Sequence, residues 1–76
     1  MSADERIARA ERALAEHGLH GATVEVEGHE REIAALRVAE ADWARLVGPD
    51  GVRLADAVKA AGFRYVALDL AGGAAN

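Results

Sequence analysis

The side chains best suited to chemistry in this sequence are three histidines and a series of glutamates. His17, His20 and His29 could bind a transition metal through their imidazole nitrogens. Four closely spaced carboxylates could instead hold a hard cation or attract a basic partner: Glu25, Glu27, Glu30 and Glu32. Both groups also have ordinary structural explanations, because imidazoles often satisfy helix-terminal carbonyls and acidic strand faces are often solvated. We expect no bound metal and no cofactor.

This chain has few residues that could serve in covalent or acid–base catalysis. The sequence has no Cys, which excludes a thiolate nucleophile, disulfides, zinc-finger sites and iron–sulfur ligation together. Ser2 is the single serine, and the single threonine, Thr23, lies in a predicted strand. Glu25 and Glu27 are neighbours on one strand face, but no residues beside them mark a substrate pocket. We therefore expect no catalytic activity from this chain alone.

Composition limits the chain to one small domain. Its 76 residues leave no room for a second core, and Ala makes up about half of its hydrophobic residues. The net charge of −4 argues against binding along nucleic-acid phosphates, which needs clustered Lys and Arg. No apolar run approaches the roughly 20 residues of a membrane span, so a cytoplasmic protein is expected. A core this thin predicts burial against another chain, either a second copy or a different protein.

The first predicted element is a helix over residues 3–17. Ser2 and Glu5 have the spacing of a capping box, in which each side chain bonds the backbone amide of the other. Apolar residues then recur at helical spacing until a glycine stop, at Ile7, Ala10, Leu14 and Gly18. A helix with one apolar stripe must pack that stripe against another element.

Two strands are predicted next, over residues 22–27 and 32–38. In the first, Val24 and Val26 alternate with polar residues, which is the period of a half-buried strand. In the second, the inward set is expected to be Ala34, Leu36 and Val38. The connector between them, residues 28–31, is short, polar and contains Gly, so the pair is predicted to form a β-hairpin.

Helical periodicity returns in the second half of the chain. A short helical stretch is predicted over residues 39–47, around Trp43, which we expect to anchor the core or an interface. Strong turn chemistry at residues 48–51 ends it, and Asp50 can cap the helix that follows. The apolar stripe of that next helix is expected to comprise Val52, Leu54, Ala55, Val58 and Ala61.

The last element is a strand over residues 64–70, after a helix stop at Gly62. Its inward residues are expected to be Val66, Leu68 and Leu70, with Tyr65, Ala67 and Asp69 on the opposite face. We expect order from about residue 3 to residue 70 and a loose tail over residues 71–76.

The element order α-β-β-α-α-β predicts a two-layer α+β domain, with a three-stranded sheet and helices packed on one face. The other sheet face is then uncovered. Alternation places there Thr23, Glu25, Glu27, Ile33, Ala35, Arg37, Tyr65, Ala67 and Asp69. A mixed face of this kind can be solvated or can form an interface. The candidate interface residues are Trp43, Tyr65, Ile33 and Arg37.

The run G-F-R-Y-V-A-L-D-L over residues 62–70 resembles the segment that closes the C-terminal domain of ATP-dependent sacrificial sulfur transferases. These enzymes belong to the PP-loop ATP-pyrophosphatase family and thiolate the pincer nucleotide of nickel lactate racemase. Weaker similarities precede this run in the same order, at residues 10–14, 23–27 and 33–38. The resemblance extends from about residue 7 to residue 76 and implies a stand-alone, degenerate version of that domain.

The sequence departs from this family at the positions that carry its chemistry. It has neither the phosphate-binding S-G-G-x-D-S loop nor the sacrificial Cys. The two Arg that engage a nucleotide phosphate in the family stand here as Glu25 and Glu27, and a third Arg stands as Ala35. This charge reversal makes anion binding on the strand unfavourable. Glu11 and Asp69 match acidic positions of the family pattern, and we expect neither to be catalytic.

The resemblance implies a non-catalytic oligomerisation or partner-binding module. Because the family's C-terminal domain helps to build both the oligomer and the active-site cleft, the implied partners are a second copy or a separately encoded PP-loop protein. Two other hypotheses stay open. In one, Glu11 or Asp69 contributes in trans to sulfur transfer or nucleotide-dependent biosynthesis on such a partner. In the other, the chain carries a small ligand or a metal.

Overall fold

A computed structural model describes residues 2–69, so the expected strand residue Leu70 and the expected tail over residues 71–76 lie outside the described part. Its elements follow the predicted order: α1 (Ala3–Glu16), β1 (Thr23–Glu27), β2 (Ile33–Arg37), the 3-10 turn η1 (Glu40–Asp42), α2 (Trp43–Val47), α3 (Gly51–Ala60) and β3 (Tyr65–Leu68). The predicted α+β class is confirmed. Among the described residues, each predicted strand is one or two residues longer than the paired segment, because strand ends leave the ladder before their sequence pattern stops.

Helix α1 begins at the predicted capping box. The Ser2 hydroxyl accepts a hydrogen bond from the Glu5 amide at 3.1 Å, and the Glu5 carboxylate accepts one from the Ser2 amide at 3.5 Å. The helix ends at Glu16, with His17 as its C-cap, and Gly18 follows at a φ of 94°. A positive φ of this size favours glycine, which explains why the helix stops here.

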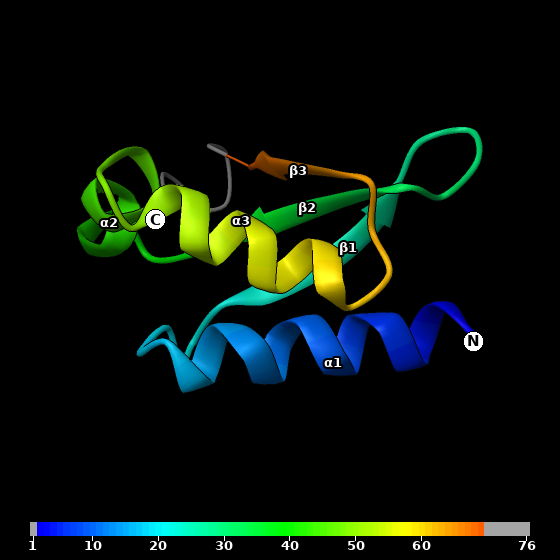
Figure 1. The fold of residues 1–76 in the computed structure, drawn as a ribbon, viewed down its shortest axis with the longest axis horizontal. Helices are drawn as coiled ribbons and strands as arrows, with labels where there is room; N and C mark the ends of the chain where they lie inside the picture. The colour runs from blue at the N-terminus through cyan, green and yellow to red at the C-terminus, as the bar shows by residue number, and fades with distance from the viewer. Residues whose placement is uncertain (1, 70–76) are drawn as a thin grey trace.

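The three strands form one mixed sheet in the order β1-β2-β3. β1 and β2 pair antiparallel as the predicted hairpin, and β3 pairs parallel to β2. The connection from β2 to β3 contains α2 and α3, as a crossover between parallel strands requires. The sheet therefore has two edges, β1 on one side and β3 on the other (Figure 1).

Helices α1 and α3 pack against each other and cover the same face of the sheet (Figure 1). Under them lies a small aliphatic core, which includes Leu14 and Leu54, both no more than 1% exposed. The strand residues predicted to point inward are buried or half-buried, namely Val24, Val26, Ala34, Leu36, Val38, Val66 and Leu68. Alternation along the strands thus separates a helix-covered face from an open face, as predicted.

Two predictions for α3 are wrong. Val52 was expected in the apolar stripe but is 70% exposed, because it precedes Leu54 by two residues and so lies about 200° around the helix from it. Asp50 occupies the N-cap position but makes no side-chain cap hydrogen bond. Its backbone is helical rather than extended, with φ −76° and ψ −13°, so its carboxylate is not aimed at the first free amides.

Three long side chains fasten the elements together. Trp43 donates its indole N–H to the Val38 carbonyl at 3.2 Å, which holds α2 to the end of β2. Arg45 donates to the carbonyl of His17 and so holds α2 to the end of α1. At the opposite end of α1, the Arg6 guanidinium lies 4.8 Å from the centre of the Phe63 ring.

Candidate functional site

The face of the sheet turned away from α1 and α3 holds most of the residues that the sequence singled out. We call it the open face, and it comprises Thr23, Glu25, Glu27, Ile33, Ala35, Arg37, Tyr65, Ala67 and Asp69. Within residues 2–69 no helix covers it, since both long helices pack on the other side. Of the five positions that the resemblance singled out, four lie here: Glu25, Glu27, Ala35 and Asp69. Strand pairing gathers them from three separate segments of the chain.

The centre of the open face is apolar. The strand register places Ile33 beside Tyr65 and places Ala35 beside Ala67. Tyr65 is 53% exposed, whereas Ala35, in the middle strand, is 5% exposed. An exposed aromatic ring beside small and aliphatic side chains is a common composition at the centre of a protein interface.

Acidic residues border this apolar centre on one side. Glu25 lies opposite Ala35 and Glu27 lies opposite Ile33, and both glutamates are exposed. Neither of them takes part in an ion pair with another residue of the described part. Two adjacent carboxylates give this side of the open face a negative potential, which the more distant guanidinium of Arg37 offsets in part.

A salt bridge borders the apolar centre at its other end. The Arg37 guanidinium donates to the Asp69 carboxylate at 3.0 Å. This hydrogen bond raises the pKa of Arg37 above its ordinary value, and the negative charges of Asp69, Glu25 and Glu27 raise it further. Arg37 therefore stays positively charged, while the other charged residues of the open face are acidic.

The predicted cluster of four glutamates is divided in the structure. Glu25 and Glu27 share the open face, and Glu30 lies in the exposed turn between the hairpin strands. Glu32 is half-buried and lies 3.6 Å from the guanidinium of Arg64, just before β3. The cluster is therefore an adjacent pair of glutamates and two separate carboxylates, because alternation sends consecutive positions to different sides.

Glu11 joins α1 to β1 through a contact that could not be foreseen from the sequence. Its carboxylate accepts a hydrogen bond from the Val24 backbone amide at 2.9 Å, in a half-buried position between α1 and β1. Glu11 therefore lies where α1 meets β1 and not on a solvated helix face. The two bonded residues are separated by a loop, and no local pattern in the sequence marks such a contact.

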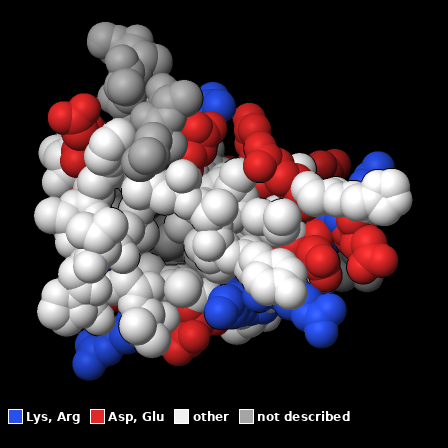
Figure 2. All heavy atoms as spheres, turned by 90° about the horizontal axis from the view of Figure 1, so that it is seen from above, with Lys and Arg blue, Asp and Glu red and all other residues white. Residues whose placement is uncertain are grey.

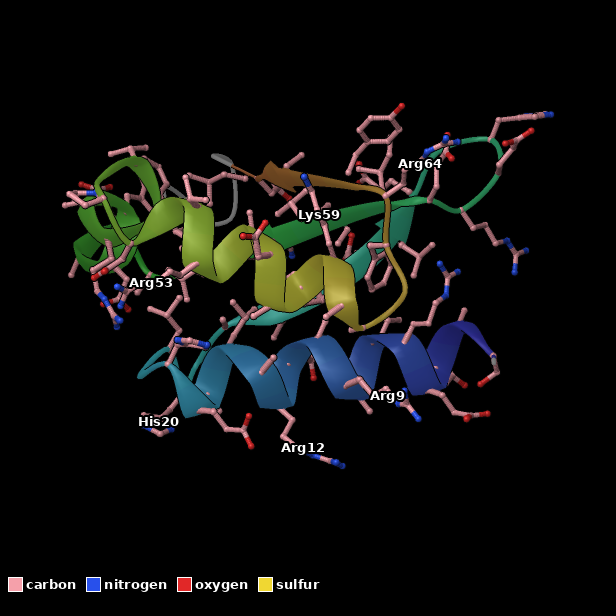
Figure 3. All side chains as sticks on the ribbon, viewed as in Figure 1. Arg9, Arg12, His20, Arg53, Lys59 and Arg64 are labelled. Atoms are coloured by element: carbon pink, nitrogen blue, oxygen red, sulfur yellow. The ribbon has the colours of Figure 1, made fainter. Side chains whose placement is uncertain are left out.

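The remaining candidates lie away from the open face. Trp43 is half-buried on α2, where its indole already bonds Val38. His20 lies near the end of α1, whereas His29 lies in the hairpin turn at the other end of the molecule (Figures 1 and 3). Among residues 2–69, no three His, Asp or Glu side chains come close enough together to hold a metal ion. In the same part of the chain, no helix has the length and apolar character needed to span a bilayer.

Two hollows lie beside the sheet edges. One, of about 150 Å³, lies between β3 and the helices, and its lining comprises Leu36, Leu46, Gly51, Ala55, Val66, Ala67 and Leu68. The other, of about 450 Å³, is a wider groove between the start of α1 and β1, which Ala3, Ile7, Val24, Glu25, Val26 and Arg31 line. Neither has the convergent polar groups that orient a substrate for reaction.

No protein-family model matches this sequence, and no curated protein matches it. The geometry of the open face therefore supplies the argument for function. It combines an apolar centre, two adjacent glutamates with no ion-pair partner in the described part of the chain, and the salt bridge between Arg37 and Asp69. These groups can bind a complementary surface, and they offer no arrangement of nucleophile and base for a reaction.

Proposed function

We propose that this protein is a non-catalytic binding module whose open face docks on a basic surface of another protein. The observation that carries the proposal is the position of Glu25 and Glu27, both exposed and unpaired in the described part, beside an apolar centre with Tyr65. Protein interfaces commonly combine an aromatic anchor with a charged rim in this way. Lys or Arg on the partner would neutralise the acidic pair, which favours a basic surface over a phosphate-bearing one.

The small core supports the same proposal. Three of the ten residues in its buried cluster are alanines, namely Ala10, Ala34 and Ala61. Because burial of apolar area is the main stabilising term, a domain with such a core gains much from covering a further apolar patch. The open face offers such a patch, because Ile33 and Tyr65 lie side by side on it and Tyr65 is 53% exposed.

We further propose that the chain is a degenerate relative of the sulfur-transferase C-terminal domain. The segment that carries the resemblance forms the expected structure, with Gly62 after α3 at a φ of 118° and β3 directly following. Under this proposal, the partner is a separately encoded PP-loop ATP-pyrophosphatase. The partner would dock where the family's phosphate-binding strand positions have become Glu25 and Glu27.

The proposal for docking is tested by charge reversal on the open face. Tagged wild-type protein and a Glu25→Lys, Glu27→Lys variant are expressed in the source organism, and co-purifying proteins are quantified by mass spectrometry at low and high salt. We expect a partner that wild type retains and the variant loses by at least tenfold, with weaker retention at high salt because exposed charge pairs are screened.

A matched control separates the open face from net charge. The double variant Glu16→Lys, Glu30→Lys makes the same change in net charge at exposed positions outside the open face. It should retain the partner at the wild-type level. Equal loss in both variants, or no protein whose capture depends on Glu25 and Glu27, would contradict the proposal.

A catalytic role in trans is the second candidate, and its support is the match of Glu11 and Asp69 to acidic family positions. Glu11 is bonded to Val24 and Asp69 to Arg37, which supports positioning roles for both. The two candidates differ in an assay of ATP-dependent thiolation with a PP-loop chain that lacks its own C-terminal domain. Unchanged activity with Glu11→Gln and Asp69→Asn would remove the catalytic candidate, while a loss with both proteins still bound would favour it.

A further inference from the structure

The two edges of the sheet differ in how well they are protected against pairing with another strand. An edge strand presents unpaired backbone amides and carbonyls, and soluble proteins usually blunt it with charges or cover it. β1 and β3 are the edges here, and they are treated in opposite ways.

The edge at β1 is protected twice. The Glu11 carboxylate already occupies the outward amide of Val24, so a new strand could not use that donor. In addition, if the β1 strands of two copies paired antiparallel in this region, Glu25 and Glu27 of one copy would lie opposite the same two glutamates of the other copy. Like charges directly opposite each other across strands are destabilising, so this edge disfavours self-association.

Among residues 2–69, the edge at β3 has neither protection. Tyr65 donates its amide to the Glu32 carbonyl and Asp69 donates to Leu36, which shows that the odd-numbered residues of this strand face β2. The amides and carbonyls of Val66 and Leu68 consequently point outward, and within residues 2–69 no side chain caps them. None of the four residues of β3, Tyr65–Leu68, is charged.

The surface along β3 matches this description. Figure 2 looks down onto this edge, where uncharged atoms fill most of the centre of the view and acidic and basic atoms lie around its margins. The hollow of about 150 Å³ borders the same edge on the helix side, with Val66 and Leu68 in its lining. A strand added here would therefore gain both backbone hydrogen bonds and apolar contacts.

We infer that the occupant of the β3 edge is the β3 edge of a second copy, paired antiparallel about a two-fold axis at Ala67. In that register Val66 of one copy lies opposite Leu68 of the other, and each can exchange both of its outward backbone hydrogen bonds. Ala67 lies opposite itself at the closer, non-hydrogen-bonded spacing, where its methyl group offers no obstacle. The strand is thus complementary to itself, as a two-fold interface requires.

Side chains on the open face agree with the same register. Tyr65 of one copy lies opposite Asp69 of the other, beside the salt-bridged guanidinium of Arg37. In this register no charged residue of one β3 edge lies opposite a residue of like charge in the other copy, in contrast to the β1 edge. The product is a continuous six-stranded sheet with all helices on one side, in which two open faces become one wider surface. This arrangement goes beyond the proposed docking function, which either a monomer or a dimer could perform.

Cysteine cross-linking tests the register directly, because the chain has no Cys of its own. In an Ala67→Cys variant, the Cα atoms of the two new cysteines would lie about 4.5 Å apart, which is close enough for a disulfide. Mild oxidation should convert most of the protein to a covalent dimer. The control, Ala8→Cys at an exposed position on α1, should remain monomeric under the same oxidant. Equal cross-linking in the two variants would overturn the inference.

Charge pairing at the same residue gives an independent test in solution. Sedimentation equilibrium should show a reversible dimer of the wild type, and Ala67→Glu and Ala67→Lys should each raise the dissociation constant at least tenfold through like-charge repulsion at the axis. An equimolar mixture of the two variants should recover the dimer. A wild type that stays monomeric at several hundred micromolar, or a dimer that both variants leave unchanged, would overturn the inference. These measurements use the purified chain alone, so their outcome is separate from that of the partner-capture experiment.

Discussion

Alternate residues of the same three strands build two sheet faces with opposite properties. The covered face contributes aliphatic side chains such as Val24 and Leu36 to a core that contains no buried polar or charged residue among those described. The open face carries exposed carboxylates, a salt bridge and Tyr65. Because each strand residue belongs to one face only, substitutions on one face can leave the other intact. Stability and binding are therefore expected to respond to different residues.

The charged side chains of the helices differ from those of the open face in being mixed. Arg9 and Arg12 extend from α1 (Figure 3), and exposed carboxylates such as Glu16 lie on the same helix. The acidic pair Glu25 and Glu27 instead lies together on the open face. Attraction of a basic partner is therefore expected to depend on the open face rather than on the helices.

The largest effect is expected from a cavity in the covered face. Leu14 is fully buried, so Leu14→Ala should cost about 2 to 5 kcal/mol, which is comparable to the whole stability of a domain of this size. Circular dichroism during urea titration should show a largely unfolded protein. The control is Val52→Ala, which removes a side chain that is 70% exposed and should change stability by less than about 0.5 kcal/mol. Equal losses of stability in the two variants would contradict the assignment of Leu14 to the core and of Val52 to the surface.

The next effect is expected at Gly62, where α3 turns into β3. An added Cβ would lie 2.8 Å from the Arg6 Cδ atom, and the φ of 118° is itself strained for any residue with a side chain. Arg6 donates from this position to the carbonyls of Arg31 and Gly62, at 2.8 and 3.1 Å. Gly62→Ala should therefore cost about 1 to 3 kcal/mol in the same urea titration.

Gly21→Ala is the matched control for this prediction. The Cβ at position 21 would meet no atom within 4 Å, and its φ lies outside the left-handed region. This substitution should leave stability unchanged or raise it by up to about 1 kcal/mol, because Ala restricts the unfolded chain more than Gly. A similar loss at both glycines would show that the strain at Gly62 is not the cause.

The covered and open faces could be predicted from sequence because they follow from local periodicity. Alternation at Val24 and Val26 and helical spacing at Ala10 and Leu14 depend only on neighbours in the chain. The same periodicity explains the error at Val52: hydrophobic character alone assigned it to the stripe, while its angle around the helix excludes it.

Contacts between distant segments could not be predicted in the same way. The parallel pairing of β2 with β3, the bond from Val24 to Glu11 and the bonds from Arg6 to two loop carbonyls join residues between 13 and 56 positions apart. Each depends on how the packed elements meet, and several other partners would fit the sequence equally well. For the candidate site, the residues on the open face could be predicted from alternation. The separation of the four glutamates into one pair and two single residues could be seen only from the strand register.

A smaller effect is expected at Glu11, where α1 meets the protected edge of the sheet. Glu11→Ala removes a charged acceptor from the Val24 amide and should cost about 1 to 2 kcal/mol. Hydrogen exchange at the Val24 amide should become faster by roughly tenfold or more, while exchange in α3 should follow only the change in global stability. Glu11→Gln keeps an acceptor oxygen and should lose less. If Gln and Ala behave alike, the carboxylate does not hold this amide in solution.

The smallest effect on stability is expected on the open face itself. In a Glu25→Gln, Glu27→Gln variant, the repulsion between the two carboxylates disappears, and so does their attraction for Arg37. The two contributions have opposite signs and both involve exposed side chains. The free energy of unfolding, obtained from thermal melts, should therefore change by less than about 0.5 kcal/mol at any salt concentration. Partner capture should nevertheless fall, because neutral side chains no longer attract a basic surface. A loss of stability near that of Leu14→Ala would mean that the acidic pair holds the fold together, and the separation of the two faces would then be wrong.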